Sequence, residues 1–286
     1  MWFTVKIFKN IITFIFTIIL TILILSYVII KLCSSTVLNE NYVISKLEEN
    51  DYYNKTYELV ESNFENYIQQ SGLDEEVLKD IITKDEIEED TKSILNNIYS
   101  GIGDNISTEK IKERLTQNID KSLENKKLSS SEKEAIDDFI DKIGNEYETT
   151  IFHTNYEKSL SNMYNKIIKM VSFGEKVILV SIGFFVILIL IINTRRIYKS
   201  ISAIGISMIS SGVIFIIAKI YINTKIKIQT ITVLNSVCST TLRNILQELL
   251  DNIITYGIIF SVIGLVLIIL SNLIHNIKKY GLEEEL

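Results

Sequence analysis

The sequence predicts an all-α membrane protein in which four transmembrane helices carry an extracytoplasmic helical domain, inserted between the first and second of them. Three observations predict this fold class: four long apolar stretches, an acidic segment with helical periodicity, and basic residues at alternate connections between the stretches. A transmembrane helix needs about 20 mainly apolar residues. The stretches that reach or approach this length are residues 11–30, 177–192, 201–218 and 253–270.

Basic residues at the ends of the apolar stretches predict how the chain is oriented in the cell membrane. Cytoplasmic loops carry an excess of Lys and Arg, which places both termini in the cytoplasm and residues 34–172 outside. Lys225, Lys227 and Arg243 oppose this assignment, because they fall in the second outer loop. The residues that support it are Lys6, Lys9, Arg195, Arg196, Lys199, Lys278 and Lys279.

The first apolar stretch is expected to anchor the chain rather than to be cleaved. Its apolar run is longer than that of a signal peptide, and residues 31–35 lack the small-x-small pattern of a cleavage site. The expected order is a cytoplasmic stub and first transmembrane helix (1–33), the acidic extracytoplasmic domain (34–172), the second transmembrane helix (173–193), a basic cytoplasmic link (194–200), the third transmembrane helix (201–222), an outer loop with an amphipathic helix (223–252), the fourth transmembrane helix (253–275) and a cytoplasmic tail (276–286).

The net charge of −6 is divided unevenly along the chain. Residues 34–172 contain 29 acidic and 16 basic residues, whereas the rest of the chain contains 6 acidic and 13 basic residues. Binding to nucleic acid needs clustered Lys and Arg side chains that neutralise phosphates. No nucleic-acid partner is therefore expected for the acidic domain.

The acidic domain is expected to contain about five helices, because apolar residues recur at helical spacing between residues 40 and 171. Each apolar stripe requires a surface to pack against. The three clearest stripes are Tyr53, Tyr57, Val60, Phe64, Tyr67 and Ile68; Ile136, Phe139, Ile140, Ile143 and Tyr147; and Tyr156, Leu160, Met163, Ile167 and Val171. A further helix with a narrow apolar face carries Ile111, Leu115, Ile119 and Leu123.

Short polar motifs predict where these helices begin and end. Thr83 with Glu86, and Ser131 with Glu134, have the spacing of a capping box, in which each side chain bonds the other's backbone N–H. We therefore expect helices to start just after Thr83 and just after Ser131. Turns are expected at residues 71–72 and 100–105. The last helix of the domain is expected to continue into the second transmembrane helix.

The sequence lacks the motifs of the common enzyme and metal-binding families. It contains no HExxH, CxxC, GxSxG or GxxxxGK[ST] pattern. The two histidines, His153 and His275, are expected on opposite sides of the membrane and so cannot share a metal. The acidic run 84–90 lacks the loop pattern of a calcium-binding EF-hand. Neither an enzymatic activity nor a cofactor or metal is expected.

The two cysteines, Cys33 and Cys238, are both expected outside, where disulfides form readily. They either form a disulfide that ties the first transmembrane helix to the second outer loop, or remain two separate thiols. A disulfide requires a short Cα separation, which the sequence does not determine.

Small residues recur every fourth position in the third and fourth transmembrane helices, where they allow close helix packing. Ala203, Ser207 and Ser211 form one such stripe, and Gly257 with Ser261 forms another. These residues pack helices of one chain together, or they form the interface of a homo-oligomer.

The transmembrane stretches contain almost no ionisable residues, which argues against a channel or transporter made of this chain alone. The inner segments are too short to form a cytoplasmic output domain. The sequence therefore predicts a non-enzymatic protein, embedded in the lipid bilayer, whose outer domain binds another membrane or envelope protein or senses an envelope condition. The alternative is an accessory subunit of a membrane transport complex.

Overall fold

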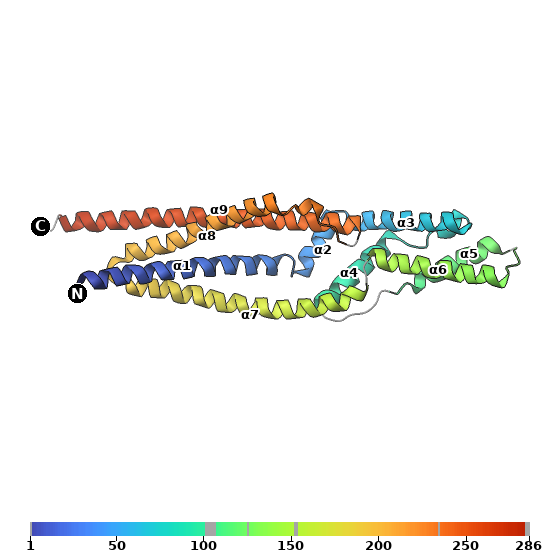
Figure 1. Ribbon diagram of the computed structural model, residues 1–286, viewed down its shortest axis with the longest axis horizontal. Coiled ribbons are helices and arrows are strands. Elements are labelled where there is room, and N and C mark those ends of the chain that lie inside the picture. Colours follow the sequence, from blue (N-terminus) through green and yellow to red (C-terminus); the bar gives the residue numbers. More distant parts are fainter. Residues whose placement is uncertain (1, 101–106, 125, 152–153, 234, 284–286) are drawn as a thin grey trace. The chain divides into compact units, whose positions relative to one another are not determined.

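The computed structural model describes residues 2–100, 107–124, 126–151, 154–233 and 235–283, which fold into α-helices and short 3-10 helices without a strand (Figure 1). The chain divides into two compact units. The membrane unit comprises Met1–Thr36, Lys169–Thr230 and Asn244–Leu286. The acidic unit comprises Val37–Ile168 and Ile231–Arg243.

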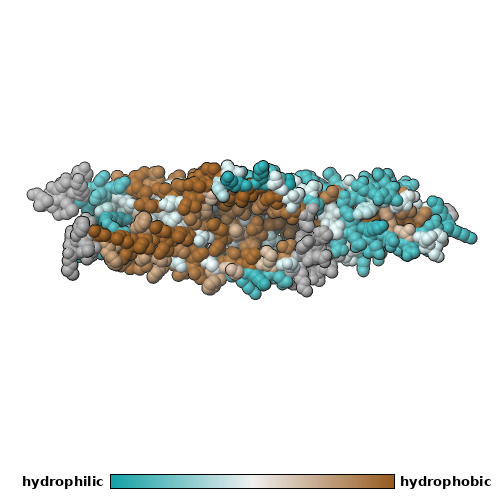
Figure 2. Space-filling model, viewed as in Figure 1, coloured by the Kyte–Doolittle hydropathy of each residue, from teal (hydrophilic) through white to brown (hydrophobic). Residues whose placement is uncertain are grey.

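Four helices are long and apolar enough to cross a membrane, as the sequence predicts. Exposed apolar side chains cover the surface of the membrane unit (Figure 2), as expected for helices surrounded by lipid. The prediction of an all-α, multi-pass protein is therefore confirmed. The helices are α1 (Trp2–Ser35), α7 (Thr154–Ile192), α8 (Ile197–Lys225) and α9 (Ser236–Glu283).

In the membrane unit, α1 packs between α7 and α8. It runs antiparallel to α7, because Phe16 packs edge-on against Phe185 while Lys31 forms an ion pair with Glu175. The hydroxyl of Ser207 on α8 donates to the carbonyl of Thr17 on α1, and that of Ser211 donates to the carbonyl of Thr21. These two helices therefore run parallel to each other. Of the most apolar part of each helix, 28% is buried in α1 and 33% in α8, against 6% in α7 and 11% in α9. The central helices of the unit are therefore α1 and α8.

Two pairs of glycines allow α8 and α9 to pack backbone to backbone. A Cβ on Gly205 would lie 2.8 Å from the carbonyl oxygen of Gly264, and one on Gly264 would lie 2.6 Å from that of Gly205. Gly212 and Gly257 meet in the same way one heptad further along both helices. Any side chain at these positions would push the two helices apart.

Five α-helices and the start of α7 form most of the described part of the acidic unit, one helix more than the about five predicted between residues 40 and 171. The five are α2 (Glu40–Glu49), α3 (Tyr52–Ser71), α4 (Lys84–Ser100), α5 (Glu109–Leu123) and α6 (Ser130–Ile151), with a 3-10 turn η1 (Glu75–Leu78) after α3. The predicted stripes of α3, α5 and α6 supply its core, which includes Val60, Phe64, Ile68, Leu115, Ile119, Ile143 and Tyr147. Burial of these stripes is what the helical spacing of the sequence predicts.

The third predicted stripe is not part of this core. Leu160 is 38% exposed and Met163 is 55% exposed on α7. The partner surface expected for this stripe is therefore not the core of the acidic unit for these two residues. They continue directly into the apolar stretch of α7, so their surroundings differ from those of a soluble helix.

Capping residues begin two helices of the acidic unit. The Thr83 N–H donates to the Glu86 carboxylate at 3.0 Å, and the Glu86 N–H donates to the Thr83 hydroxyl at 3.2 Å, as predicted. The second predicted box is wrong by two residues: Ser129 caps α6 with Glu132 instead of Ser131 with Glu134. Both pairs have the same spacing, and the earlier pair forms the capping box at the start of α6.

The acidic unit also includes a segment from the predicted second outer loop. The side-chain amide of Asn235 donates to the carbonyl of Thr150 at 2.7 Å, and Val237 packs with Leu47, Tyr52 and Tyr53. From Ser236 the chain continues as the single helix α9, which agrees with an amphipathic helix that runs into the fourth transmembrane helix.

Candidate functional site

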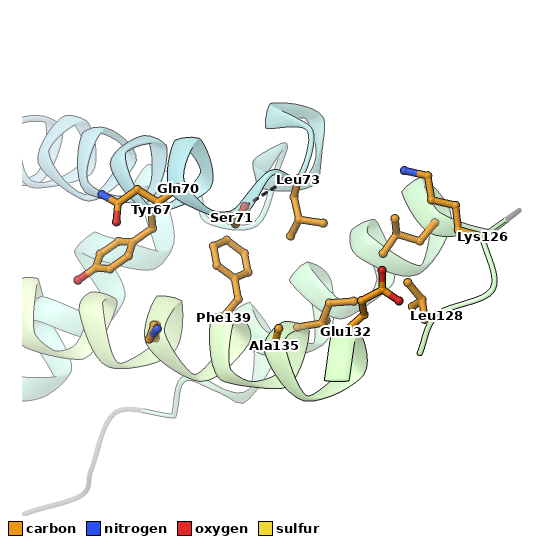
Figure 3. Close-up of a pocket in the computed structure, with 12 residues that line it drawn as sticks. Tyr67, Gln70, Ser71, Leu73, Lys126, Leu128, Glu132, Ala135 and Phe139 are labelled. Carbon is orange, nitrogen blue, oxygen red and sulfur yellow. Dashed lines mark hydrogen bonds between the residues drawn. The ribbon is translucent and has the colours of Figure 1, made fainter. Parts of the chain in front are cut away.

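A pocket of about 550 Å³ opens where α3 ends, α5 ends and α6 begins (Figure 3). Its volume lies in the range of about 300–1,000 Å³ that is usual for binding pockets. We call it the end pocket. Its lining residues are Tyr67, Gln70, Ser71, Leu73, Leu123, Lys126, Leu128, Glu132, Ala135, Ile136, Phe139 and Lys142.

The end of α3 forms one wall of the end pocket. Gly72 has φ of +72°, a left-handed conformation that ends the helix and that other residues rarely adopt. The hydroxyl of Ser71 donates to the carbonyl of Ile68 and accepts from the N–H of Leu73. Together these bonds turn the chain so that Leu73 faces the pocket (Figure 3).

The start of α6 forms the opposite wall. Ser129 and Glu132 cap the helix, and Ala135 and Phe139 follow on the side that faces the pocket. The ring of Phe139 points from α6 towards the end of α3, near Ser71 (Figure 3). The pocket therefore has an apolar floor made by side chains from three helix ends.

Two lysines, Lys126 and Lys142, are among the residues that line the pocket. Neither forms an ion pair among the described residues. The one carboxylate of the lining, Glu132, accepts bonds from the N–H and hydroxyl of Ser129, which lower its pKa. The pocket thus combines apolar surface with two basic side chains, in a unit whose net charge is negative.

A network of hydrogen bonds orients the far side of the pocket. The hydroxyl of Tyr67 donates to Glu146 at 3.1 Å, and the Asn63 amide donates to the same carboxylate at 2.7 Å. The negative charge of Glu146 raises the pKa of Tyr67. These bonds tie α3 to α6 and hold the Tyr67 ring in place as part of the pocket wall.

The end pocket lies away from the segments by which the chain enters and leaves the acidic unit. From Glu132 in the pocket, α6 runs 18 residues to Thr150, which contacts Asn235 of the returning segment. This corresponds to about 27 Å at about 1.5 Å per residue. The pocket is therefore at the opposite end of the unit from this connection.

No group of three or more potential metal ligands occurs among the described residues. His153 falls outside the part of the chain that the structure describes. His275 stacks on Tyr198 with 4.4 Å between ring centroids, at one end of the membrane unit. The structure thus gives the described histidine an aromatic neighbour.

The predicted small-residue stripes face two different neighbours within one chain. Ala203, Ser207 and Ser211 are buried, and the two serine hydroxyls donate to carbonyls of α1 at 3.1 and 3.3 Å. Gly257 and Ser261 lie against Gly212 of α8 instead. Both stripes are therefore occupied by contacts inside the membrane unit.

Both cysteines are free thiols in the structure. Cys33 belongs to the membrane unit and Cys238 to the acidic unit. Whether Cys33 and Cys238 form a disulfide stays a prediction.

Most residues of the end pocket have no signature in the sequence. Gln70, Lys126, Lys142 and Glu132 are common types on helix surfaces, and their spacing is unremarkable. The nearest signal is the turn at residues 71–72, which correctly marks one helix end. That three helix ends meet around one space depends on long-range packing. Comparison of the chain with protein-family models, with curated proteins and with solved structures found no match.

Proposed function

We propose that this chain is a non-enzymatic, multi-pass protein of the cell membrane that binds a protein partner through the end pocket. Its acidic domain, residues 34–172, lies outside the cytoplasm, and both termini lie inside. The partner is another membrane or envelope protein. It inserts an apolar side chain between Leu73 and Phe139 and pairs separate carboxylates with Lys126 and with Lys142.

One observation carries this proposal: an apolar pocket with two lysines in its lining, at the end of α6 away from the Thr150–Asn235 contact. Charged side chains that have no ion-pair partner among the described residues are available to a partner of opposite charge. The apolar floor supplies a place for a buried anchor residue, the feature that carries most of the affinity in protein interfaces.

The proposed orientation is supported by the basic residues Arg195, Arg196 and Lys278 at one end of the membrane unit. Single cysteines test it directly, in a variant in which both native cysteines are replaced by serine. A cysteine at Asp138 should react with a membrane-impermeant maleimide in intact cells. A cysteine at Arg196 should react only after the cells are opened, and the reverse result would contradict the orientation.

A second candidate is an accessory subunit of a membrane transport complex. The observation that favours it is the outer position of α7, whose most apolar part is only 6% buried in the chain. This surface suits lipid or the flank of a larger permease equally well. In that case the partner would cross-link to α7 rather than to the end pocket.

Site-specific photo-crosslinking in native membranes separates these proposals. A photoreactive residue at Ala135, inside the end pocket, should cross-link to one membrane or envelope protein. The same residue at Asp138 of α6 is the control. The captured segment should contain a large apolar residue next to Asp or Glu.

Charge reversal provides the second test of the proposed function. Lys126→Glu with Lys142→Glu should abolish the cross-link. Reversal of two exposed lysines on the adjoining helices α5 and α6, Lys121→Glu with Lys133→Glu, should leave it unchanged. Cross-linking from Ala135 that survives the first pair of substitutions would overturn the role of the end pocket.

A further inference from the structure

One end of the membrane unit gathers basic side chains from α1, α8, α9 and the short turn before α8. Arg195 and Arg196 are exposed in this turn, η2 (Thr194–Arg196). We call the cluster the basic end. Its described residues are Lys9, Arg195, Arg196, Lys199 and Lys278.

Specific contacts bring these residues to one place. The ammonium of Lys199 donates to the side-chain oxygen of Asn10 at 3.1 Å, which joins α8 to α1. The ammonium of Lys278 donates to the carbonyl of Arg195 at 3.2 Å, which joins α9 to the turn. The hydroxyl of Ser271 also donates to the Tyr198 carbonyl at 2.6 Å. Hydrogen bonds between helices therefore hold the residues of the basic end together.

Glu175 of α7 and Asp251 of α9 lie at the other end of the membrane unit. Glu175 pairs with Lys31 at 3.2 Å, and Asp251 pairs with Lys219 at 2.5 Å. No acidic residue occurs in segments 1–39, 176–247 and 252–282 of the sequence. Nothing within these segments can neutralise the basic end by an ion pair.

The separation of the two charged ends matches the thickness of a membrane. Arg195 follows Glu175 by 20 residues, and Lys219 follows Lys199 by 20 residues. Each interval corresponds to about 30 Å along a helix, close to the roughly 30 Å hydrocarbon core of a bilayer. The basic end therefore lies at the level of the lipid headgroups when the helices span a membrane.

The C-terminal tail supplies too few negative charges to neutralise this end. It contains Glu283, Glu284 and Glu285, against seven basic residues in segments 1–10, 194–200 and 276–286. The sequence at this end therefore carries an excess of positive charge.

We propose that the basic end is a binding site for the phosphate headgroups of anionic phospholipids. Guanidinium groups suit this role, because their planar fork of donors matches two phosphate oxygens at once. Arg195 and Arg196 are both exposed at headgroup level, and Lys9 and Lys278 flank them on neighbouring helices. Clusters of basic residues at helix ends bind anionic lipids for the same electrostatic reason.

Native mass spectrometry of the full chain in mild detergent tests this proposal. Phosphatidylglycerol is added to the protein, with phosphatidylcholine as the zwitterionic comparison. Phosphatidylglycerol should bind more tightly, and Arg195→Gln with Arg196→Gln should weaken its binding by roughly tenfold or more. The matched control, Lys225→Gln with Lys227→Gln, removes two charges at the opposite end of α8 and should retain wild-type binding.

Four results would overturn the proposal. The first is equal binding of the two lipids, and the second is equal loss of phosphatidylglycerol in both double variants. The third is lipid selectivity that appears only after Glu283, Glu284 and Glu285 are changed to Gln, which would mean that the tail already occupies the cluster. Inorganic phosphate at millimolar concentration should compete only weakly, and full competition would assign the site to free phosphate instead.

Discussion

The guanidinium of Arg114 on α5 forms two parallel hydrogen bonds to the carboxylate of Glu86 on α4, at 2.9 and 2.6 Å. Arg114 also donates to the carbonyl of Ile81 at 3.3 Å, so a single side chain links three segments of the acidic unit. The hydrogen bonds from Arg114 are the main reason why the pKa of Glu86 lies below its usual value. The same carboxylate caps α4 through Thr83.

The Glu86–Arg114 pair is expected to stabilise the acidic unit at neutral pH. Because the folded pKa of Glu86 is lowered, its contribution is present above the unfolded pKa of about 4.3 and is lost as the pH falls through the folded pKa. Arg114→Ala should lower the free energy of opening of α4 and α5 by about 1 kcal/mol at pH 7, a modest value because the pair is partly exposed.

Hydrogen exchange of the α4 and α5 amides in the full chain measures this effect. The neighbouring exposed carboxylate provides the control, since Glu113→Gln should change exchange little. Equal destabilisation by Arg114→Ala at pH 7 and at pH 2 would contradict an ionic contribution from Glu86.

A second prediction concerns Asp90 and Tyr147, which meet inside the acidic unit. The tyrosine hydroxyl donates to the carboxylate at 2.5 Å, and burial raises the pKa of Asp90. Ionised Asp90 therefore opposes folding, and stability is lost as the pH rises through its folded pKa. Tyr147→Phe should cost about 1.5–3 kcal/mol at pH 7, because it leaves a partly buried carboxylate without this donor.

The variant Asp90→Asn separates the charge from the packing of the tyrosine ring. Tyr147→Phe should destabilise the Asp90→Asn variant less than it destabilises the wild type. Hydrogen exchange of the α6 amides measures the difference. If Tyr147→Phe costs the same in both backgrounds, the negative charge of Asp90 does not strengthen its bond to Tyr147.

Close packing of α8 on α9 predicts an unequal tolerance of glycines to larger residues. Gly264→Leu should lower thermal stability in detergent, at a cost of at least about 1–3 kcal/mol, because a Cβ there already meets the α8 backbone. Gly183 on α7 is the matched control, since a Cβ at that glycine meets no atom within 4 Å. Gly183→Leu should leave the melting temperature unchanged, and an equal decrease in both variants would refute the close approach.

The buried serines of α8 predict that this stripe is not an interface between copies of the chain. Ser207 is 0% exposed and donates to α1. A single cysteine at Ser207, in a chain with Cys33 and Cys238 replaced by serine, should form no disulfide-linked dimer in membranes under oxidising conditions. A cysteine at the 46% exposed Ile206 serves as the accessible comparison. A dimer formed through residue 207 would restore the oligomer interpretation.

Local patterns in the sequence determined the parts of the fold that depend on neighbouring residues. The apolar stretches identify the four membrane helices, because length and hydrophobicity alone decide whether a helix suits a bilayer. The stripe of α5 identifies a buried face, and Thr83 with Glu86 identifies a helix start, since both depend on residues within two turns of each other. The start of α6 could not be determined from the sequence, because Ser129 with Glu132 and Ser131 with Glu134 both have the spacing of a capping box.

Tertiary structure decided which surfaces meet. The stripe of small residues at Ser207 and Ser211 fits α1, a second helix or another copy equally well by sequence, and packing across 190 residues of chain selects α1. The pairing of Gly205 with Gly264 and the end pocket around Phe139 arise in the same way. Helical periodicity specifies that a face must be covered, whereas the identity of its neighbour depends on shape complementarity between distant segments.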